Sequence, residues 1–127
     1  MATCPLAPGY YYISTREHQF VGVSQSAVAV NGTKMRFHIT KNGTSPNCTY
    51  EITFGSNFAQ DDHGEVAIGH YHQQWEIKQW GQVYTVQLKG TNRAWTDPQG
   101  PPSPHRQLYL DELNAALPWQ QFWFTKA

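Results

Sequence analysis

The feature that most constrains the fold is a set of four apolar anchors that recurs three times along the chain. Each segment opens on an aromatic residue two positions before an aliphatic one, and closes on a similar aromatic-x-apolar step. The anchors are 9, 8 and 9 residues apart in the first segment, 8, 8 and 9 in the second, and 11, 13 and 14 in the third. They are Tyr11, Phe20, Val28 and Phe37, then Tyr50, Phe58, Val66 and Trp75, then Tyr84, Trp95, Leu108 and Phe122. This agreement indicates an internal repeat whose third unit has longer loops.

The anchors lie in short stretches where apolar and polar residues alternate, which is typical of half-buried β-strands. Turn-forming Gly and Asn residues separate these stretches. The sequence therefore predicts an all-β chain of twelve short strands in three pseudo-repeats, at about residues 9–42, 48–81 and 82–127. Three such units form the pattern of a β-trefoil, in which six strands close a barrel and six cap one end. An irregular β-sandwich is the alternative, because short strands at this spacing also occur there.

Length and charge bound the class of protein. A chain of 127 residues is expected to form a single domain over 1–127 with a substantial core. Nine Lys and Arg balance nine Asp and Glu, which excludes nucleic acid as a partner because phosphate binding needs surplus basic residues. No apolar run exceeds four residues, so no membrane insertion is expected. The oligomeric state stays open, because a neutral net charge does not oppose self-association.

The N-terminal residues and the cysteines bear on where the protein is found. The first nine residues lack the basic and apolar stretches of a signal peptide. The expected location is therefore cytoplasmic, with non-classical release as the alternative. Cys4 and Cys48 are too few for a disulfide scaffold or a zinc site, and whether they join is left open because a cytosolic setting would keep them reduced. The sequons at Asn31, Asn42 and Asn47 are interpreted as turn sequences rather than glycan sites.

One segment departs from the strand pattern. Residues 111–118 carry Leu113 and Leu117 at helical spacing, which predicts a single helical turn that Pro118 ends. Trp80 falls in a turn and is expected at the surface. The aromatic residues expected in the core are Trp75, Trp123, Tyr50 and Tyr84.

From Gly9 to Phe124 the chain resembles the small β-trefoil proteins of mushroom fruiting bodies. The stretches similar to their serine protease inhibitors are Gly9-Tyr10-Tyr11-Tyr12-Ile13, Phe20-Val21-Gly22, Gln74-Trp75-Glu76-Ile77, Tyr84-Thr85-Val86, and Trp95 with the Pro-rich loop before Gln107-Leu108-Tyr109-Leu110. The resemblance implies a non-enzymatic inhibitor of proteases in fungal defence or regulation. In that family the reactive loop commonly joins the second and third strands, which matches Ser24, Gln25 and Ser26 here. This loop is shorter than a loop that projects far into a protease cleft.

A second resemblance is to the ricin-B-like lectins, whose repeats carry a Gln-x-Trp step. Gln73-Gln74-Trp75 matches this step in full, and Gln120-Gln121-Phe122 matches it with Phe in place of Trp. The resemblance implies a carbohydrate site made of an Asp, an aromatic platform and an amide. The candidate sugar-binding residues are Asp61, Asp62, His63, Tyr71, Gln73, Trp95 and Asp97. A carbohydrate-binding lectin is therefore the alternative function, and a storage or defence protein without a defined ligand is a third.

Two further loops are candidates for contact with a protease. Residues 95–106 contain four prolines between positions 98 and 104, and a stiff loop loses little entropy on docking. The candidate contacts there are Pro104, His105 and Arg106, the last of which would enter an acidic specificity pocket; the alternative is a spacer that covers the barrel. The loop that starts at residue 40 offers Lys41 and Asn42, or serves as a linker between repeats.

Signatures of catalysis are absent from the sequence. It contains no nucleophile elbow, P-loop or dinucleotide fingerprint. His70 and His72 would share one face of a strand, but no third residue has the spacing of a metal ligand, so neither a metal nor another cofactor is predicted. The expected protein is therefore not an enzyme, and its expected partner is a protease or a glycan.

Overall fold

The computed structural model describes residues 4–42, 48–99 and 105–127. Its elements are β1 (Gly9–Thr15), β2 (Phe20–Ser24), β3 (Ala27–Val30), β4 (Arg36–Asn42), β5 (Thr49–Phe54), β6 (Asn57–Asp62), β7 (Glu65–Gly69), β8 (Trp75–Trp80), β9 (Val83–Leu88), β10 (Arg93–Thr96), β11 (Arg106–Gln107), β12 (Tyr109–Glu112), the 3-10 helix η1 (Pro118–Gln120) and β13 (Phe122–Lys126). The chain is all-β, as predicted. Within the described residues no helix is long and apolar enough to cross a membrane.

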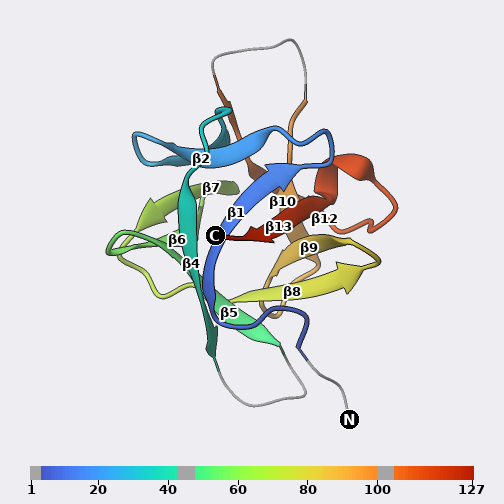
Figure 1. Cartoon of the computed structure of the whole chain (residues 1–127), viewed down its shortest axis with the longest axis horizontal. Helices are drawn as coiled ribbons and strands as arrows, with labels where there is room; N and C mark the ends of the chain where they lie inside the picture. Colours follow the sequence, from blue (N-terminus) through green and yellow to red (C-terminus); the bar gives the residue numbers. More distant parts are fainter. Residues whose placement is uncertain (1–3, 43–47, 100–104) are drawn as a thin grey trace.

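Six of the strands close into a ring, which Figure 1 shows around the centre of the molecule. The first and last strands of each predicted unit pair with each other, β1 with β4, β5 with β8, and β9 with β13. The last strand of each unit then pairs with the first strand of the next, β4 with β5, β8 with β9, and β13 with β1. Every pair is antiparallel, and the ring leaves no strand edge unpaired.

The register of the ring repeats three times. Within each unit the first anchor lies opposite the last, and these pairs are Tyr11 with Phe37, Tyr50 with Trp75, and Tyr84 with Phe122. Between units, the residues two positions further along lie opposite each other, and these pairs are Ile39 with Ile52, Ile77 with Val86, and Phe124 with Ile13. The period-two pattern thus points equivalent side chains of all three units into the same barrel.

The remaining strands form hairpins that meet at one end of the ring. β2 pairs with β3, β6 with β7, and β10 with β12, and β3, β7 and the β11–β12 segment also pair with one another. At this junction Leu108 donates its N–H to the Val28 carbonyl oxygen at 2.9 Å and accepts from the Val66 N–H at 2.9 Å. The backbone N–H and carbonyl of Leu108 are thus hydrogen-bonded to the first and second units. The single strand predicted there is therefore divided into β11 and β12 at this residue. The described chain therefore has thirteen strands where twelve were predicted.

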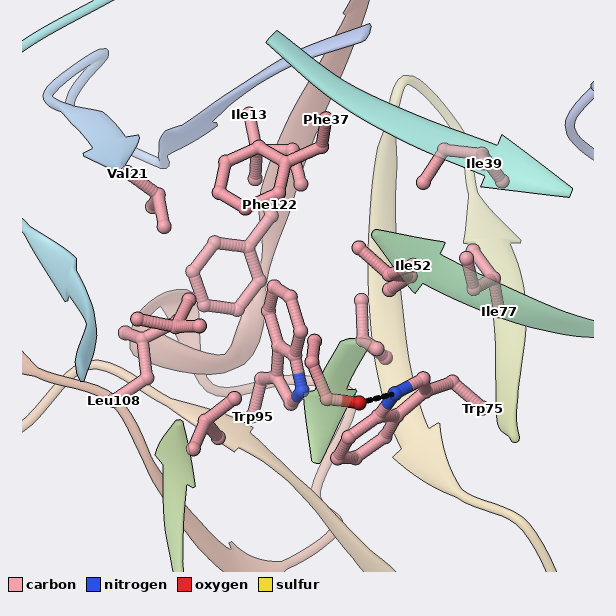
Figure 2. Close-up of a cluster of buried hydrophobic side chains, with 14 of the residues drawn as sticks. Ile13, Val21, Phe37, Ile39, Ile52, Trp75, Ile77, Trp95, Leu108 and Phe122 are labelled. Atoms are coloured by element: carbon pink, nitrogen blue, oxygen red, sulfur yellow. Dashed lines mark hydrogen bonds between the residues drawn. The ribbon is translucent and has the colours of Figure 1, made fainter. Parts of the chain in front are cut away.

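The core is built around packed aromatic rings. Trp95 is completely buried and meets Trp75 and Phe122 edge to face, with ring centroids 5.7 and 6.1 Å apart. Figure 2 shows these rings beneath the aliphatic residues of the ring strands, with the Trp75 Nε1–H donating to the Ala59 carbonyl oxygen at 3.0 Å. This bond satisfies the buried indole donor of Trp75, whereas the Trp95 Nε1–H has no hydrogen-bond partner among the described residues.

Five predictions of aromatic burial or exposure can be compared with this core. Trp75 and Tyr50 are buried as predicted, and Trp80 is 45% exposed as predicted. Tyr84 packs against the core but is only partly buried. Trp123 lies on the outer face of β13, where its ring stacks on His18, because it is the residue between two inward-pointing ones.

The predicted helical turn at residues 111–118 is wrong. The backbone instead makes a tight turn, in which the Leu117 N–H donates to the Asn114 carbonyl oxygen and the Asn114 side chain accepts from the Ala116 N–H at 3.1 Å. Asparagine favours such local bonds over a helix, and a residue before proline is biased to extended backbone. Pro118 therefore begins the helix η1 rather than ending one.

The N-terminal segment closes against the ring. Leu6 is buried, and its backbone exchanges two hydrogen bonds with the Tyr50 hydroxyl, at 3.2 and 2.9 Å. Cys4 forms a disulfide with Cys48, just before β5. Disulfides persist in oxidising compartments and are reduced in the cytosol. A cytoplasmic location, which stays a prediction, would leave both cysteines as thiols, and release from the cell would close the bond.

Replacing both cysteines with serine is expected to lower the free energy of unfolding by about 2–4 kcal/mol, because the bond closes a segment of 44 residues in the unfolded chain. Urea unfolding of the oxidised protein and of the Cys4→Ser/Cys48→Ser variant measures this loss. The oxidised protein in the presence of a reductant is the matched control and should approach the variant. Equal midpoints for all three samples would contradict the expected role of the bond.

Alkaline pH is expected to destabilise the fold through its buried tyrosines. Burial raises the pKa of Tyr11 and of Tyr50 above the ordinary value of 10.0. The unfolded chain therefore loses these protons first. The contribution of these tyrosines to the free energy of unfolding should be fully present below pH 10.0 and be lost as the pH rises through the folded-state values. Urea midpoints across this range, followed with tyrosinate absorbance, measure the effect. Tyr50→Phe should show a shallower decline, and a slope unchanged by that variant would count against the assignment.

Candidate functional site

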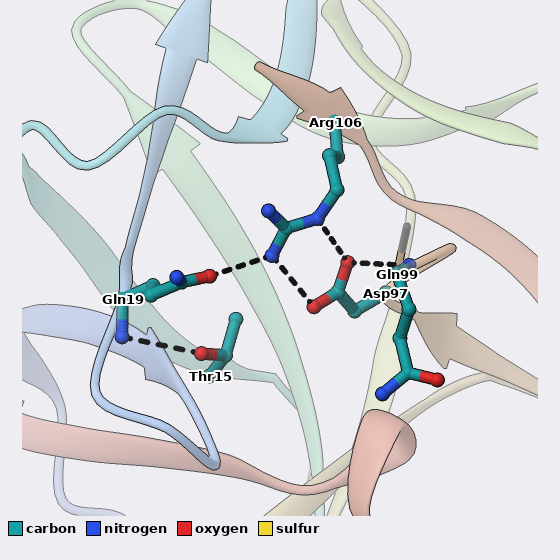
Figure 3. Close-up of polar contacts among 5 residues, drawn as sticks. All are labelled: Thr15, Gln19, Asp97, Gln99 and Arg106. Carbon is teal, nitrogen blue, oxygen red and sulfur yellow. Dashed lines mark hydrogen bonds and ion pairs between the residues drawn. The ribbon is translucent and has the colours of Figure 1, made fainter. Parts of the chain in front are cut away.

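An ion pair joins the two ends of the Pro-rich connection between β10 and β11. The Arg106 guanidinium donates from Nε to Asp97 Oδ1 at 2.9 Å and from Nη2 to Asp97 Oδ2 at 3.0 Å. The same Oδ1 accepts the Gln99 backbone N–H at 3.0 Å, so three donors converge on one carboxylate (Figure 3). The side chains of Arg106 and Asp97 are 12% and 3% exposed. We call this pair the loop clamp.

The loop clamp is fixed to neighbouring elements. Arg106 Nη2 also donates to Gln19 Oε1 at 2.7 Å, in the turn that precedes β2, and the Asp97 N–H donates to the Trp119 carbonyl oxygen at 2.8 Å. The hydrogen bonds that Arg106 donates to Asp97 raise the pKa of Arg106 above its ordinary value. A bidentate Arg–carboxylate pair of this kind fixes orientation as well as charge.

The clamp changes the role expected for Arg106. The sequence predicts that this side chain enters the specificity pocket of a protease, but the guanidinium is bonded to Asp97 and Gln19 and is not free to enter one. The neighbouring His105 is exposed, as are Pro98 and Gln99 on the other side of the connection. Pro104, also predicted as a contact, lies outside the described residues.

The other predicted contact loops lie elsewhere. Gln25 and Ser26 form a two-residue turn after Ser24, which pairs with Ala27. Gln25 has a positive φ of 58°, and the Ser26 carbonyl oxygen accepts the Ile68 N–H at 2.8 Å. This turn is exposed, but it is short and hydrogen-bonded to β7. It is therefore a short loop, as the sequence predicts, rather than one that projects far into a protease cleft.

Lys41 and Asn42 lie at the end of β4, paired with Tyr50 and Thr49 of β5. Lys41 is exposed. Figure 1 shows β5 and β2 on opposite sides of the molecule, so Lys41 and the loop clamp beside β2 do not form one contact surface. A single protease would therefore engage one of these loops and not both.

The predicted sugar-binding residues are only partly brought together. The Asp61 N–H donates to Gln73 Oε1 at 3.4 Å, while Asp61 Oδ1 accepts the Gly64 N–H at 2.8 Å within the β6–β7 turn. Asp62 and His63 pair with each other in solvent at 2.9 Å. Tyr71 is 64% exposed. The Asp61 carboxylate therefore stabilises the β6–β7 turn, and its Oδ1 is already engaged there.

Trp95 and Asp97 do not fit the sugar site proposed from the sequence. Trp95 is completely buried between Trp75 and Phe122, so no face of its ring can reach a sugar. The Asp97 carboxylate is buried in the loop clamp, where Arg106 and the Gln99 N–H use its oxygens. Both residues belong to the structural support of the β10–β11 connection.

Two other expectations concern metals and glycans. Among the described residues no group of three His, Cys, Asp or Glu could hold a metal ion. The Asn31 amide donates to Ser24 Oγ at 3.0 Å, and its carbonyl oxygen accepts the Thr33 N–H at 3.0 Å. This geometry is the turn predicted for the first sequon. Asn47 and the Asn42 side chain lie outside the part that the structure describes.

Gln19 and Gln120 are supports that the sequence did not reveal. Gln120 is completely buried, donating to Thr96 Oγ1 at 3.1 Å and accepting the Asn114 N–H at 2.7 Å. In the sequence, Gln120 stands out only as the first residue of the Gln-x-Trp-like step Gln120-Gln121-Phe122. Gln19 is 87 residues from Arg106 in the chain, and no local pattern relates two residues so far apart.

Comparison with known proteins yields a structural likeness. The sequence matches no protein-family model and no curated protein. Among solved structures, the chain is similar to a proteinase inhibitor from Coprinopsis cinerea, with a TM-score of 0.81 and 16% sequence identity. The likeness covers 96% of this chain and 99% of that one. At this identity it shows a shared overall fold.

Proposed function

We propose that the chain is a β-trefoil protein that inhibits proteases, has no catalytic activity of its own, and acts in fungal defence or regulation. The closed ring with its threefold register supports the β-trefoil assignment. The likeness to the Coprinopsis inhibitor over nearly the whole chain supports the inhibitory role. It gives no support to the lectin alternative.

The observation that carries this proposal is the loop clamp at the ends of an exposed, Pro-rich connection. A protein inhibitor must hold its binding loop in one conformation before docking, because each freely rotating residue would otherwise cost binding free energy. The sequence carries prolines at positions 98, 101, 102 and 104, and the proline ring fixes φ. The buried pair of Asp97 and Arg106 joins the two ends of the connection. The chain thus combines the two devices that preorganise a loop.

Within this proposal the β10–β11 connection contacts the protease and Arg106 is a positioning residue. The exposed side chains of Pro98, Gln99 and His105 are the described residues best placed for contact. The turn at Gln25 is a weaker candidate, because it is only two residues long and its Ser26 carbonyl oxygen is bonded to the Ile68 N–H of β7.

Titration against a panel of active-site-titrated proteases tests the function. The panel should hold trypsin-like, chymotrypsin-like and papain-like enzymes, and residual hydrolysis of a small substrate is the readout. We expect at least one enzyme to lose activity in proportion to the added protein, reaching a plateau near one equivalent. Residual activity that stays flat for every enzyme would overturn the proposal.

Two matched variants then locate the contact. His105→Ala is expected to weaken inhibition with an unchanged urea midpoint, because the side chain is exposed and no hydrogen bond or ion pair joins it to another of the described residues. Lys41→Ala, an exposed residue at the end of β4, is expected to leave inhibition unchanged. The reverse result would assign the contact to the β4–β5 side and contradict the loop assignment.

A further inference from the structure

The outer face of β1 and its two neighbours carries a second unusual set of side chains. The alternation that buries Tyr11 and Ile13 turns Tyr10 and Tyr12 outward. On β4, Arg36 lies opposite Tyr12 and His38 lies opposite Tyr10. On the other side, Thr125 of β13 lies opposite Tyr12. Figure 1 shows β13, β1 and β4 side by side, so these residues form one continuous surface, here called the β1 face.

Cations and aromatic rings alternate along the β1 face. Lys34 Nζ lies 4.5 Å from the centroid of the Tyr12 ring, and Arg36 Cζ lies 5.0 Å from the centroid of the Tyr10 ring. The Tyr10 ring in turn contacts His38, with centroids 4.6 Å apart. Cation–π contacts of this kind hold the charged groups in place without neutralising them.

Two adjoining hollows lie along this face. The first, of about 250 Å³, is lined by Tyr12, Ser14, His18, Phe20, Lys34, Thr125 and Lys126. The second, of about 370 Å³, is lined by Tyr10, Arg36, His38, Thr53, Phe54 and Gly55. Neither lining contains a carboxylate. Among residues 4–42, 48–99 and 105–127, the ion pairs involve none of Lys34, Arg36 and Lys126.

Lys34 and Arg36, which lie over tyrosine rings, and Lys126 have no carboxylate partner among the described residues, and the two hollows also offer hydroxyl groups. These groups together indicate the chemistry of a ligand. Sulfate or carboxylate groups satisfy the cations. Sugar hydroxyls match the hydroxyl groups of Ser14, Thr53 and Thr125 in the two linings. We propose that the β1 face binds an acidic saccharide, a short sugar chain that carries sulfate or carboxylate groups.

Other anionic partners fit these observations less well. A long nucleic acid needs a surplus of basic residues, and the chain is neutral overall. An acidic protein surface would need a larger and flatter contact, whereas the β1 face offers two small concave sites. None of the residues that line the hollows belongs to the loop clamp, although His18 and Phe20 flank Gln19, which bonds to Arg106. The proposed site therefore uses other side chains than the proposed inhibition.

Calorimetric titration of the full chain with a sulfated, glucuronate-containing disaccharide tests the proposal. Lactose, which is neutral, and inorganic sulfate, which has charge without a sugar ring, are the comparison probes. We expect the acidic disaccharide to bind more tightly than either one. No measurable binding of the disaccharide, or equal affinity for inorganic sulfate, would overturn the acidic-saccharide site.

Variants assign the binding to the β1 face. Lys34→Gln/Arg36→Gln should weaken disaccharide binding by about tenfold or more, since each lost charge-assisted contact has an effect of that order. Lys78→Gln/Lys89→Gln, on and just after the β8–β9 pair, is the charge-matched control and should bind as the unchanged chain does. Equal losses in both variants would overturn the assignment to this face. Shifts of the Tyr10 and Tyr12 ring resonances in the unsubstituted protein provide a readout that needs no variant, and unshifted rings would contradict the proposal.

Discussion

Arg106→Ala is expected to lower the free energy of unfolding by about 3–5 kcal/mol, although the residue stands beside an exposed loop. The substitution leaves the Asp97 carboxylate buried and without its charged partner, and an uncompensated buried charge is more costly than the pair itself is favourable. Asp97 is 3% exposed, so water cannot replace the guanidinium without opening the site. Urea unfolding monitored by tryptophan fluorescence measures the change.

Matched variants separate the loop clamp from a general effect of losing an arginine. Arg93→Ala removes an exposed arginine of β10 whose Nη2 donates to the Leu110 carbonyl oxygen at 3.0 Å, and it should cost less than about 1 kcal/mol. The double variant Asp97→Ala/Arg106→Ala should be less destabilised than the sum of its single variants. Additive losses, or a single-variant loss no larger than that of Arg93→Ala, would show that the clamp is not a coupled pair.

The same variant links stability to function. With Arg106 replaced, the ends of the β10–β11 connection are no longer tied, and inhibition of the sensitive protease should weaken by about tenfold or more for each 1.4 kcal/mol of lost preorganisation. Arg106→Lys should recover part of the stability, because lysine restores the charge but not the bidentate geometry. Inhibition that survives Arg106→Ala in a folded variant would contradict the positioning role of the clamp.

Trp75→Ala is the second substitution with a large expected effect, about 3–5 kcal/mol of unfolding free energy. Trp75 is completely buried, packs edge to face on Trp95, and donates its indole N–H to Ala59. Alanine would leave a cavity in the barrel and an unpaired carbonyl oxygen beside it. Urea unfolding again provides the measurement.

The control for this substitution is Trp80→Ala in the same strand. Trp80 is 45% exposed and bonds through its Nε1–H to Thr85 Oγ1 at 2.9 Å, so its removal should cost less than about 1 kcal/mol. Similar losses for the two tryptophans would contradict the assignment of Trp75 to a repeating core position.

Much of the fold could be predicted because its regularity lies along the chain. The spacing of the anchors marks each strand, and the period of two marks the side that is buried. The pairing of Tyr11 with Phe37, and of its equivalents, follows once the three units are recognised. The predicted helical turn was wrong because Leu113 and Leu117 have helical spacing, while the local bonds of Asn114 decide the backbone.

The candidate site was less predictable, because residue type does not reveal how a charge is used. The four prolines predict a stiff loop between β10 and β11, and its contact with a protease stays a prediction. In the sequence alone, Arg106 cannot be told apart from an exposed loop arginine. The ion pair between Arg106 and Asp97 forms because the fold buries both side chains and brings Gln19, from a turn far away in the sequence, against the guanidinium. Trp95 is likewise an aromatic residue of the kind that stacks on sugars, which is why the sequence predicts it in a sugar site. Its complete burial depends on how the three units close around it.

The central claim is that the clamped β10–β11 connection docks into a protease. Hydrogen exchange of the chain, alone and in complex with a protease that it inhibits in the panel, tests this most directly. The account predicts added protection of the amides from Asp97 to Arg106, with no change at the β4 end near Lys41. Protection at β4 or elsewhere, with residues 97–106 exchanging as in the free chain, would contradict it.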